Sequence, residues 1–253
     1  MLQLLPQPAI IAHRGASMHA PENSLAAFRL ALEQGADAIE MDVRLTADER
    51  LVIFHDPFLH RITGRKGQVR KTSSAVLSGL DVGQAYDNAF AGEKIPLLQV
   101  VLQEIGPHIP LNLEFKTNLR DSKLVIHLFR DLLQKQKIPL DHLLISSFNP
   151  LLLWECHRQL PELDLGLIIH RSTYKIWKAS QLLKIVPLQS LHVPHHDITE
   201  HLIRETKHVG LKLLAYTVNS PQDFRTLTEQ SIDGFFTDDP ALAKRILYPP
   251  PEK

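Results

Sequence analysis

Strand-like and helix-like segments alternate along almost the whole chain, and this alternation limits the possible folds more than any other feature. Short runs rich in Val, Ile, Leu and Phe are each followed by a segment with the apolar spacing of an amphipathic helix. Strands followed by helices end near His13, Asp42, Lys116, Phe148, His170, Pro194, Asn219 and Asp238. Eight such units in 253 residues predict an α/β fold, a (β/α)8 or TIM-type barrel.

The alternative is a doubly wound open sheet, but no Gly-x-Gly-x-x-Gly motif of a dinucleotide-binding sheet follows any predicted strand. An extra strand, residues 51–55, is expected to return antiparallel to the second barrel strand. Residues 57–95 carry turn signals and a basic run, 65–71, which is interpreted as a solvated surface rather than a phosphate-attracting rim. A helix is predicted over 173–186. Residues 1–253 are therefore interpreted as one barrel domain with an insertion at about 57–95.

Charge and hydropathy exclude two classes of protein. The 28 Lys and Arg residues balance 28 Asp and Glu residues, which argues against a nucleic-acid binder. No segment approaches the roughly 18 consecutive apolar residues of a membrane span. The N-terminal segment lacks the basic region of a secretory signal. Cys156 is the only cysteine, so an internal disulfide is excluded, and a cytoplasmic location is predicted.

The segment 39–56 holds the first indication of chemistry. Glu40 and Asp42 lie two residues apart in a predicted strand, so both carboxylates point to one face, while the neighbouring apolar side chains point to the other. Two adjacent carboxylates repel each other when buried, and a hard divalent cation such as Mg²⁺ or Ca²⁺ relieves the repulsion. The alternative is a surface strand whose carboxylates face water.

Polar residues gather at the predicted C-terminal ends of several barrel strands, where active sites of this fold lie. Glu114 and Lys116 are again two residues apart and face the same way. The converging set is His13, Arg14, Glu40, Asp42, His55, Glu114 and Lys116. Arg and Lys bind phosphate oxygens, and two histidines can serve as general base and general acid near neutral pH. This set predicts a site for a phosphate ester.

Nine segments resemble the glycerophosphodiester phosphodiesterase family, and they occur in the family's order from residue 10 to 240. They read AHRGAS, APENSLAAF, IEMDVRLTADERLVIFHDPFLHRITGRKGQV, LSGLDVG, GEKIPLLQVV, LNLEFK, ISSFNP, YTVN and DGFFTDDP. His-Arg-Gly alone is a weak signal, whereas the ordered set is specific. The resemblance, to the soluble bacterial type, implies a TIM-type barrel that cleaves glycerophosphodiesters to sn-glycerol 3-phosphate and an alcohol.

The resemblance also implies a divalent metal ion, Mg²⁺ or Ca²⁺, and a role for each matched residue. The matched positions are, for the metal, Glu40, Asp42 and Glu114; for catalysis, His13 and His55; for the substrate phosphate, Arg14 and Lys116; and for a supporting segment near the site, Glu22 and Asn23. The implied partner is the small-molecule diester. The head group, the metal, the acid and base assignment of the histidines and the oligomeric state stay open.

The chain departs from the family pattern at three positions. Ser24 replaces the usual Thr of Glu-Asn-Thr and keeps a hydroxyl. The usual glycine of the hairpin turn is absent near Glu49, so that turn is expected to adopt another geometry. Tyr216 replaces the usual Trp before Thr-Val-Asn and is expected to alter the wall against which glycerol or the alcohol packs. None of the three changes removes a catalytic group.

Five other residues near the strand ends have open interpretations. Asp238 is a hydrogen-bond partner for a histidine or for a substrate hydroxyl, and Phe148 is either a lid contact or simple packing. His192, His195 and His196 are interpreted as a polar loop, because no third ligand is spaced to complete a second metal site.

The leading hypothesis is a metal-dependent phosphodiesterase. One alternative is a related lipid phosphodiesterase of the lysophospholipase D kind, which needs a wide apolar groove that the sequence does not show. The other is a catalytically silent barrel that binds glycerophosphodiesters. A silent member is expected to have lost a histidine or a carboxylate, and here all are present.

Overall fold

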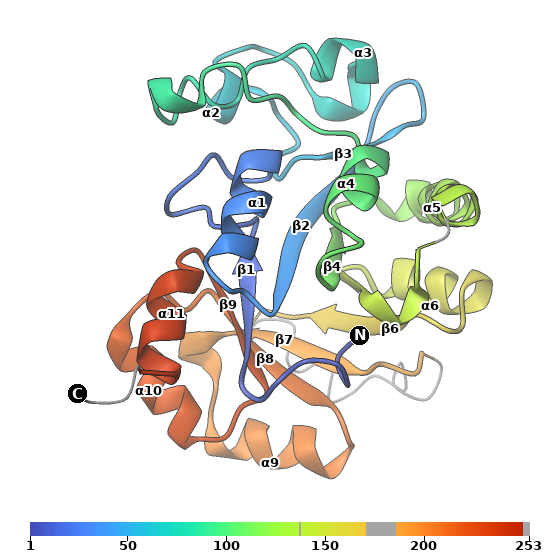
Figure 1. Cartoon of the computed structure of the whole chain (residues 1–253). Helices are drawn as coiled ribbons and strands as arrows, with labels where there is room; N and C mark the ends of the chain where they lie inside the picture. Colours follow the sequence, from blue (N-terminus) through green and yellow to red (C-terminus); the bar gives the residue numbers. More distant parts are fainter. Residues whose placement is uncertain (137, 171–185, 250–253) are drawn as a thin grey trace.

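The computed structural model describes residues 1–136, 138–170 and 186–249, and eight parallel strands close into a barrel (Figure 1). The ring is complete because β1 pairs with both β2 and β9. Its strands are β1 (Ala9–His13), β2 (Ala38–Leu45), β4 (Leu111–Phe115), β5 (Leu143–Ser147), β6 (Asp164–Ile168), β7 (Ser190–Pro194), β8 (Lys212–Tyr216) and β9 (Gly234–Thr237). The predicted TIM-type barrel is confirmed.

Helices surround the ring and return the chain from the end of one strand to the start of the next (Figure 1). The longer helices are α1 (Leu25–Glu33), α4 (Leu98–Glu104), α5 (Ser122–Gln136), α6 (Pro150–Gln159), α9 (Glu200–His208), α10 (Pro221–Glu229) and α11 (Pro240–Leu247). Short 3-10 turns are η3 (Leu119–Asp121), η4 (Leu140–His142) and η6 (His195–Asp197). The helix predicted over 173–186 falls almost wholly outside the described residues.

Polar caps begin several of the helices that follow the barrel strands. The side chains of Ser24, Asn149, Thr199, Ser220 and Asp239 each accept a hydrogen bond from a backbone N–H in the first turn. Such a cap contributes about 1 kcal/mol to helix stability. Because the caps lie at the C-terminal ends of the strands, they also fix the loops that surround the barrel mouth.

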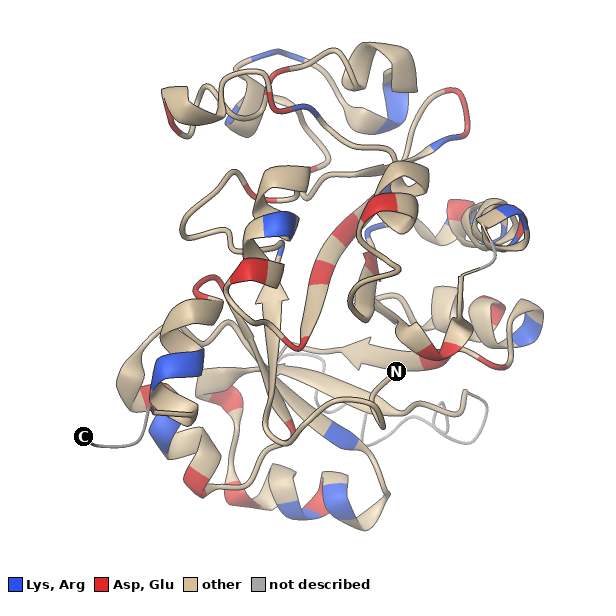
Figure 2. Ribbon diagram, viewed as in Figure 1, with Lys and Arg blue, Asp and Glu red and all other residues tan. Residues whose placement is uncertain are grey.

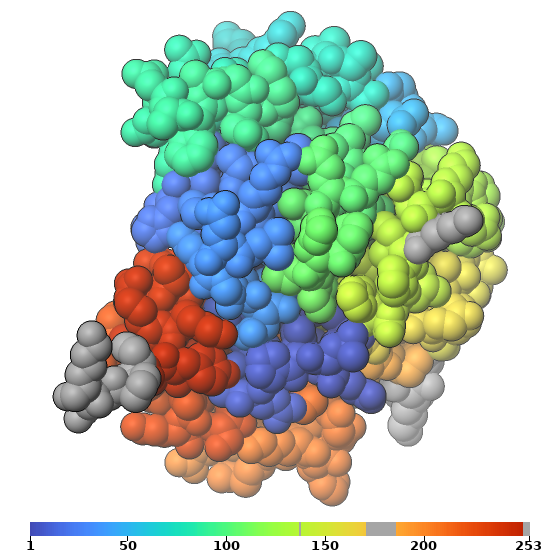
Figure 3. All heavy atoms as spheres, viewed as in Figure 1, coloured from blue at the N-terminus to red at the C-terminus, as the bar shows by residue number. Residues whose placement is uncertain are grey.

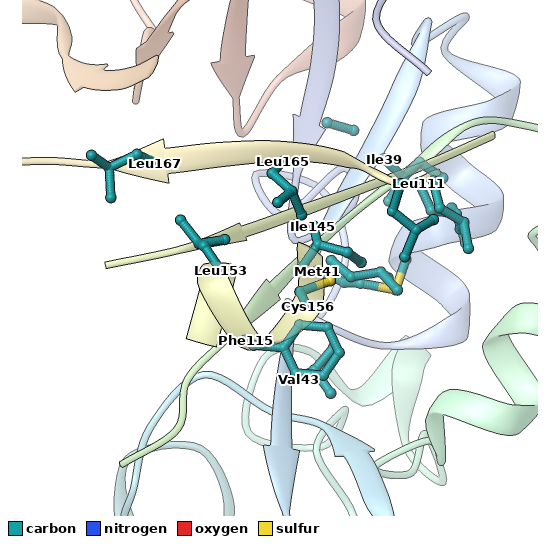
Figure 4. Packing of buried hydrophobic residues seen from close by; sticks show 14 of the residues in the cluster. Ile39, Met41, Val43, Leu111, Phe115, Ile145, Leu153, Cys156, Leu165 and Leu167 are labelled. Carbon is teal, nitrogen blue, oxygen red and sulfur yellow. The ribbon is translucent and has the colours of Figure 1, made fainter. Parts of the chain in front are cut away.

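The main apolar core lies between the ring and its helices. Alternate β2 residues Ile39, Met41 and Val43 point outward and pack with Phe115 of β4 and with Cys156 of α6 (Figure 4). All five are buried, as expected for Cys156 from its helical apolar pattern. Full burial of one such aliphatic side chain stabilises the fold by about 1.5–3 kcal/mol. The other β2 residues must therefore face the barrel interior.

Part of the barrel interior, including the first residues of β1 and β2, is apolar. A second buried cluster fills that part: Met1, Leu2, Ala9, Ile11, Ala38, Leu144, Leu214 and Phe236. Polar side chains of β2, β4 and β7 occupy the interior positions farther along the strands. The functional groups therefore gather at the C-terminal end, as the barrel prediction requires.

A hairpin leaves the ring after β2. The strand β3 (Leu51–Ile53) pairs antiparallel with β2, as predicted for the extra strand. The expectation of a changed turn geometry was wrong, because Glu49 adopts φ 57°, the left-handed conformation that glycine favours. The turn is closed by Thr46, whose backbone N–H donates to Arg50 O (2.9 Å) and whose Oγ1 accepts from Arg50 N (2.9 Å).

The segment between β3 and α4, here called the cap segment (residues 54–97), forms a layer over one end of the molecule (Figure 3). It contains α2 (His60–Thr63), η1 (Val69–Lys71), α3 (Ser74–Leu77) and η2 (Asn88–Phe90). Together with Val52 of β3 it forms a separate apolar cluster that contains Phe54, Leu59, Val69, Leu77, Val82 and Ile95. Polar bonds tie it to the loops after β1, β2 and β4, among them Arg61 to Glu22, Ser74 to Asp48 and Arg70 to Asp121.

Within the described residues, every helix is too short or too polar to cross a membrane.

Candidate active site

The three predicted metal ligands lie together at the C-terminal end of the ring. Glu40 and Asp42 follow each other on the interior face of β2, and the strand register places Asp42 opposite Glu114 of β4. Carboxylate oxygens of the three residues lie within 4.8 Å of one another. Acidic positions are visible along β2 in Figure 2. The three residues are 3%, 1% and 8% exposed respectively, so the alternative of water-facing carboxylates is wrong.

Burial and neighbouring charges shift the pKa values of the three carboxylates in different directions. Burial, and then the charges of Asp42 and Glu114, hold the pKa of Glu40 well above its usual range. Burial and Asp42 likewise raise the pKa of Glu114. Burial also tends to raise the pKa of Asp42, but the charges of Lys116 and Arg14 outweigh it and lower the value to about 2. Asp42 is therefore ionised, while its two neighbours are ionised at a cost that a further cation would remove.

Arg14 and Lys116 supply the positive charge of the site. The backbone N–H of Arg14 donates to Glu40 Oε2 (2.9 Å), and its Nε lies 3.4 Å from Asp42 Oδ2. Arg14 adopts φ 59°, which turns this N–H toward the carboxylate. Lys116 Nζ lies 3.3 Å from Asp42 Oδ1 and also contacts Glu114. Both predicted phosphate-binding residues therefore border the acidic cluster.

The supporting segment before α1 holds the cluster from one side. Asn23 Nδ2 donates to Asp42 Oδ2 (2.8 Å), and the backbone N–H of Asp42 donates to Asn23 Oδ1 (3.1 Å). Glu22 Oε1 accepts from Arg14 (3.0 Å). Ser24 caps α1 through its hydroxyl, so the substitution of Thr by Ser keeps the hydrogen bond that fixes this segment.

The first predicted catalytic histidine is anchored by the ring itself. His13 ends β1, and its Nδ1 lies 2.7 Å from Asp238 Oδ1, directly after the neighbouring strand β9. Asp238 also accepts from Ser17 Oγ (3.0 Å) and from Asn219 Nδ2 (2.6 Å). Burial tends to raise the pKa of Asp238, but the hydrogen bond and charge of His13 outweigh it, and the pKa falls to about 2.

The second histidine is anchored by the cap segment. The backbone N–H of Phe54 donates to Asp42 O (2.9 Å), which brings the end of the hairpin, and with it His55, back to the barrel mouth. His55 Nδ1 lies 2.6 Å from Asp56 Oδ1. Asp56 Oδ2 accepts from Arg61 Nε (2.5 Å). Burial, the largest influence, lowers the pKa of His55 and favours the neutral ring.

These contacts fix which ring nitrogen can react. An ionised carboxylate only accepts hydrogen bonds, so Nδ1 of each histidine carries the proton that it donates to its aspartate. The Nε2 atom is then the proton-exchanging nitrogen of the neutral ring. His13 and His55 both line the same cavity.

The cavity has a volume of about 310 Å³, and aromatic side chains line it together with the charged residues. Phe148 stacks on His170, with ring centroids 4.6 Å apart, and is 39% exposed. Tyr216 donates from its hydroxyl to Ile169 O (3.0 Å). Lys116 Nζ lies 5.6 Å from the centre of the Phe148 ring. Phe148 and Tyr216 thus both line the cavity, and Phe148 is more than internal packing.

The interpretation of three histidines as one polar loop was wrong. His192 lies within β7, is 1% exposed and lines the cavity from inside the barrel. Its Nε2 hydrogen-bonds with Ser190 Oγ (2.9 Å), and its ring packs on Phe236. Burial lowers its pKa to about 3, so the ring is neutral. Only His195 and His196 belong to the following turn, η6.

The sequence had indicated Asp238 as a possible histidine partner, and it binds His13, but sequence reasoning missed Asp56 and the residues that hold the two aspartates. Asp56 directly follows His55, and this adjacency was the available signal. Arg61 lies five residues farther on, outside the basic run 65–71 that was interpreted as solvated surface, and no sequence pattern linked it to the site. Ser17 and Asn219 flank predicted loops, and no spacing rule connects them to Asp238.

A sequence profile of the glycerophosphoryl diester phosphodiesterase family matches residues 13–242. The chain belongs to this family. Among curated members, it is 34% identical over 237 residues to the glycerophosphodiester phosphodiesterase of Caldanaerobacter subterraneus subsp. tengcongensis, covering 91% of this chain and 94% of that protein. It is 30% identical over 241 residues to the enzyme of the same name from Bacillus altitudinis, covering 94% and 97%.

Solved structures of the family share the fold. A phosphodiesterase from Oleispira antarctica, in complex with the product sn-glycerol-3-phosphate, superposes with a TM-score of 0.89 and 32% identity, covering 97% of this chain and 98% of that one. A glycerophosphodiester phosphodiesterase from Thermotoga maritima gives a TM-score of 0.75 and 26% identity over 94% and 97% of the two chains. This family member therefore matches its enzymatic relatives over nearly their whole length.

Proposed function

We propose that this family member is a metal-dependent phosphodiesterase that hydrolyses glycerophosphodiesters to sn-glycerol 3-phosphate and an alcohol. The observation that carries the proposal is the pair of imidazoles, each anchored through Nδ1 by a carboxylate and both lining one charged cavity. The names of the relatives and the product complex of the Oleispira neighbour support the same substrate class.

Arg14 and Lys116 are the proposed phosphate contacts. Both line the cavity, and both are positively charged side chains that already lie beside carboxylates. Burial lowers the pKa of Lys116, but the charges of Asp42 and Glu114 outweigh it and raise the pKa above its ordinary value. The amine therefore stays protonated and can attract a phosphodiester anion at neutral pH.

The acidic cluster fits a hard divalent cation, and we assign Mg²⁺ or Ca²⁺ to Glu40, Asp42 and Glu114. The donors are all oxygens, they lie within 4.8 Å of one another, and Glu40 Oε1 is buried without a hydrogen-bond partner among the described residues. When bound, the ion supplies charge stabilisation for phosphate oxygens. It would also relieve the repulsion that raises the pKa of Glu40 and Glu114.

His13 and His55 share the proton transfers. In the first stage a glycerol hydroxyl attacks phosphorus while one imidazole takes the hydroxyl proton at Nε2. The bond from phosphorus to the alcohol oxygen breaks, and the other ring, as imidazolium, donates its Nε2 proton to that oxygen. In the second stage water opens the cyclic phosphate, the rings exchange roles, and both regain their starting protonation.

The lipid alternative has one structural observation in its favour. Leu119 and Leu151 follow β4 and β5 at the mouth end of the barrel and are 65% and 52% exposed, and Phe148 lies between them in sequence. An apolar rim could accept the acyl chain of a lysophospholipid. Comparing hydrolysis of glycerophosphocholine with that of lysophosphatidylcholine separates the two substrate classes, and we expect the former to be preferred because the cavity is small.

The decisive experiment measures release of sn-glycerol 3-phosphate from several glycerophosphodiesters, with and without a chelator. We expect release that EDTA abolishes and that added Mg²⁺ or Ca²⁺ restores. Full activity after exhaustive chelation, with no metal found by elemental analysis, contradicts the metal assignment. Binding of the diesters without any release instead supports the silent barrel.

A further inference from the structure

Arg61, on the short helix α2 of the cap segment, joins two carboxylates that belong to different parts of the site. Its Nε donates to Asp56 Oδ2 (2.5 Å). Its two terminal nitrogens donate to the two oxygens of Glu22, at 2.9 and 2.7 Å. The guanidinium is thus bidentate toward Glu22 while a third nitrogen binds Asp56, and this fork geometry is specific to arginine.

Each of these two carboxylates also binds a residue that lines the cavity. Asp56 binds Nδ1 of His55, one of the two proposed acid–base groups. Glu22 binds Arg14, a proposed phosphate contact, at 3.0 Å. Arg61 therefore lies at the centre of a continuous chain of polar contacts that ends at a histidine on one side and at an arginine on the other.

The charges along this chain depend on Arg61. Burial tends to raise the pKa of Asp56, but hydrogen bonds from Arg61 and His55 outweigh it and lower the pKa. The same holds for Glu22, where burial is outweighed by Arg61 and Arg14. Without Arg61, Asp56 would keep only His55 as a side-chain partner among the described residues, and its carboxylate could rotate away from Nδ1.

The other histidine is held differently. Asp238 is fixed beside His13 by Ser17 and Asn219, and no arginine from the cap segment contributes to that arrangement in the described part of the chain. Loss of Arg61 should therefore affect one histidine and leave the other in place.

We propose that Arg61 is a positioning residue of the reaction, which holds Asp56 against His55 and Glu22 against Arg14. This inference rests on the proposed phosphodiesterase function and adds a role for the cap segment. Arg61 touches no reacting atom in this scheme; it keeps the proton of neutral His55 on Nδ1, so that Nε2 is free for proton transfer. It also aligns Arg14 for the substrate phosphate.

The competing interpretation is an ordinary surface ion pair. The Arg61 side chain is 47% exposed, and exposed ion pairs contribute little to stability. A merely structural arginine would leave the tautomer of His55 unchanged. The two interpretations therefore differ in a spectroscopic signal and in turnover, and not in stability alone.

The test compares Arg61→Ala with Arg65→Ala. Arg65 follows α2 closely, and its side chain makes no hydrogen bond or ion pair within the described residues, so it controls for loss of positive charge on the cap segment. We expect Arg61→Ala to lower kcat about 10- to 100-fold on glycerophosphocholine, the range found when groups that orient functional ligands are removed, and to raise KM. Arg65→Ala should stay within about twofold.

The independent measurement is nitrogen-15 NMR of the His55 ring at a pH where it is neutral, with His13 as internal reference. In the unsubstituted protein the His55 proton should reside on Nδ1, and Arg61→Ala should shift population toward the Nε2-protonated form. His13 should be unaffected. This signal needs no turnover, so it stands if the protein fails to hydrolyse glycerophosphodiesters, which would overturn the proposed function separately.

Two results overturn the inference. One is Arg61→Ala with kcat within twofold of the unsubstituted protein. The other is a loss of kcat with an unchanged His55 tautomer, because Arg61 then does not hold Asp56 in the position that sets the His55 proton. Should Arg61→Ala fail to fold, Arg61→Lys supplies the same test, because lysine keeps the charge but cannot bind both carboxylates in a fork. We expect this variant to show an intermediate loss of kcat and a partial tautomer shift. If both kcat and the His55 tautomer match those of the unsubstituted protein, the inference is overturned.

Discussion

The two histidines of the cavity are held by two different kinds of structure. His13 and Asp238 end adjacent strands of the closed ring, so their separation follows from β-sheet pairing. His55 and Asp56 lie beyond the ring, after a hairpin, and Arg61 of the cap segment secures them. The ring side depends on backbone register and a buried core, whereas the hairpin side depends on polar bonds between loops.

This difference indicates where change is tolerated. Displacing a barrel strand would disturb the core around β2 and β4, and with it the acidic cluster. The cap segment has a small core of its own and bonds mainly to loops, so its sequence can vary around a few retained contacts. We therefore expect the cap segment to adjust substrate choice while the ring preserves the chemistry.

The largest expected effect comes from removing either histidine. His13→Ala and His55→Ala should each reduce turnover of glycerophosphocholine about 100- to 10,000-fold, the usual contribution of a general acid or base. A nitrophenyl ester that keeps the glycerol hydroxyl has a leaving group that needs no proton. The variant without the acid should be substantially rescued on this substrate, and the variant without the base should not.

Rate measurements of both variants on both substrates assign the two roles to the ring histidine and the hairpin histidine. Equal rescue of the two variants, or rescue of neither, contradicts the division of labour between His13 and His55.

Within the ring, neighbouring carboxylates should respond in opposite directions. Asp42→Asn removes a buried charge paired with Arg14 and Lys116, and breaking such a pair costs about 3 kcal/mol or more. Glu40→Gln removes a carboxylate whose raised pKa makes its ionised form unfavourable above pH 4.5, so the metal-free protein should be as stable or more stable. Thermal unfolding in EDTA measures both effects, and a large destabilisation by Glu40→Gln would show that its charge is needed for folding.

The stability that Asp238 gives to the ring side of the site should depend on pH. Its folded pKa of about 2 lies below the ordinary value of 3.8, so the ionised carboxylate stabilises the fold above that value. This contribution, about 2 kcal/mol, is lost as the pH falls from 3.8 toward 2. Urea unfolding over this range should show a steeper loss of stability for the unsubstituted protein than for Asp238→Asn. Parallel pH profiles for the two proteins would argue against a strong His13–Asp238 bond.

The smallest expected effect lies in the hairpin that carries His55 back to the mouth. Glu49 adopts a left-handed conformation, which costs a non-glycine residue about 1 kcal/mol, while glycine adds some entropy to the unfolded chain. Glu49→Gly should therefore raise the free energy of unfolding by a few tenths to about 1 kcal/mol. Chemical denaturation detects the change, and kcat should stay the same. A destabilised variant would mean that the Glu49 side chain contributes more than its conformation costs.

The sequence alone predicted the features that depend on local pattern. The alternation of strands and helices led to the ring, and the two-residue spacing of Glu40 and Asp42 and of Glu114 and Lys116 put each pair on one face. The order of the family segments led to the activity now proposed. The single-domain boundary and the cytoplasmic location stay predictions.

Other features of the site were decided only by the tertiary structure, because they depend on closure of the ring and on contacts between loops. His13 and Asp238 are 225 residues apart, and no local pattern connects them until β1 pairs with β9. His192 was grouped with His195 and His196 as a polar loop because no third ligand was spaced to complete a metal site, yet the barrel interior buries it beside the cavity. No sequence pattern connected Arg61 to the site, and only the folded cap segment turns its guanidinium toward Asp56 and Glu22.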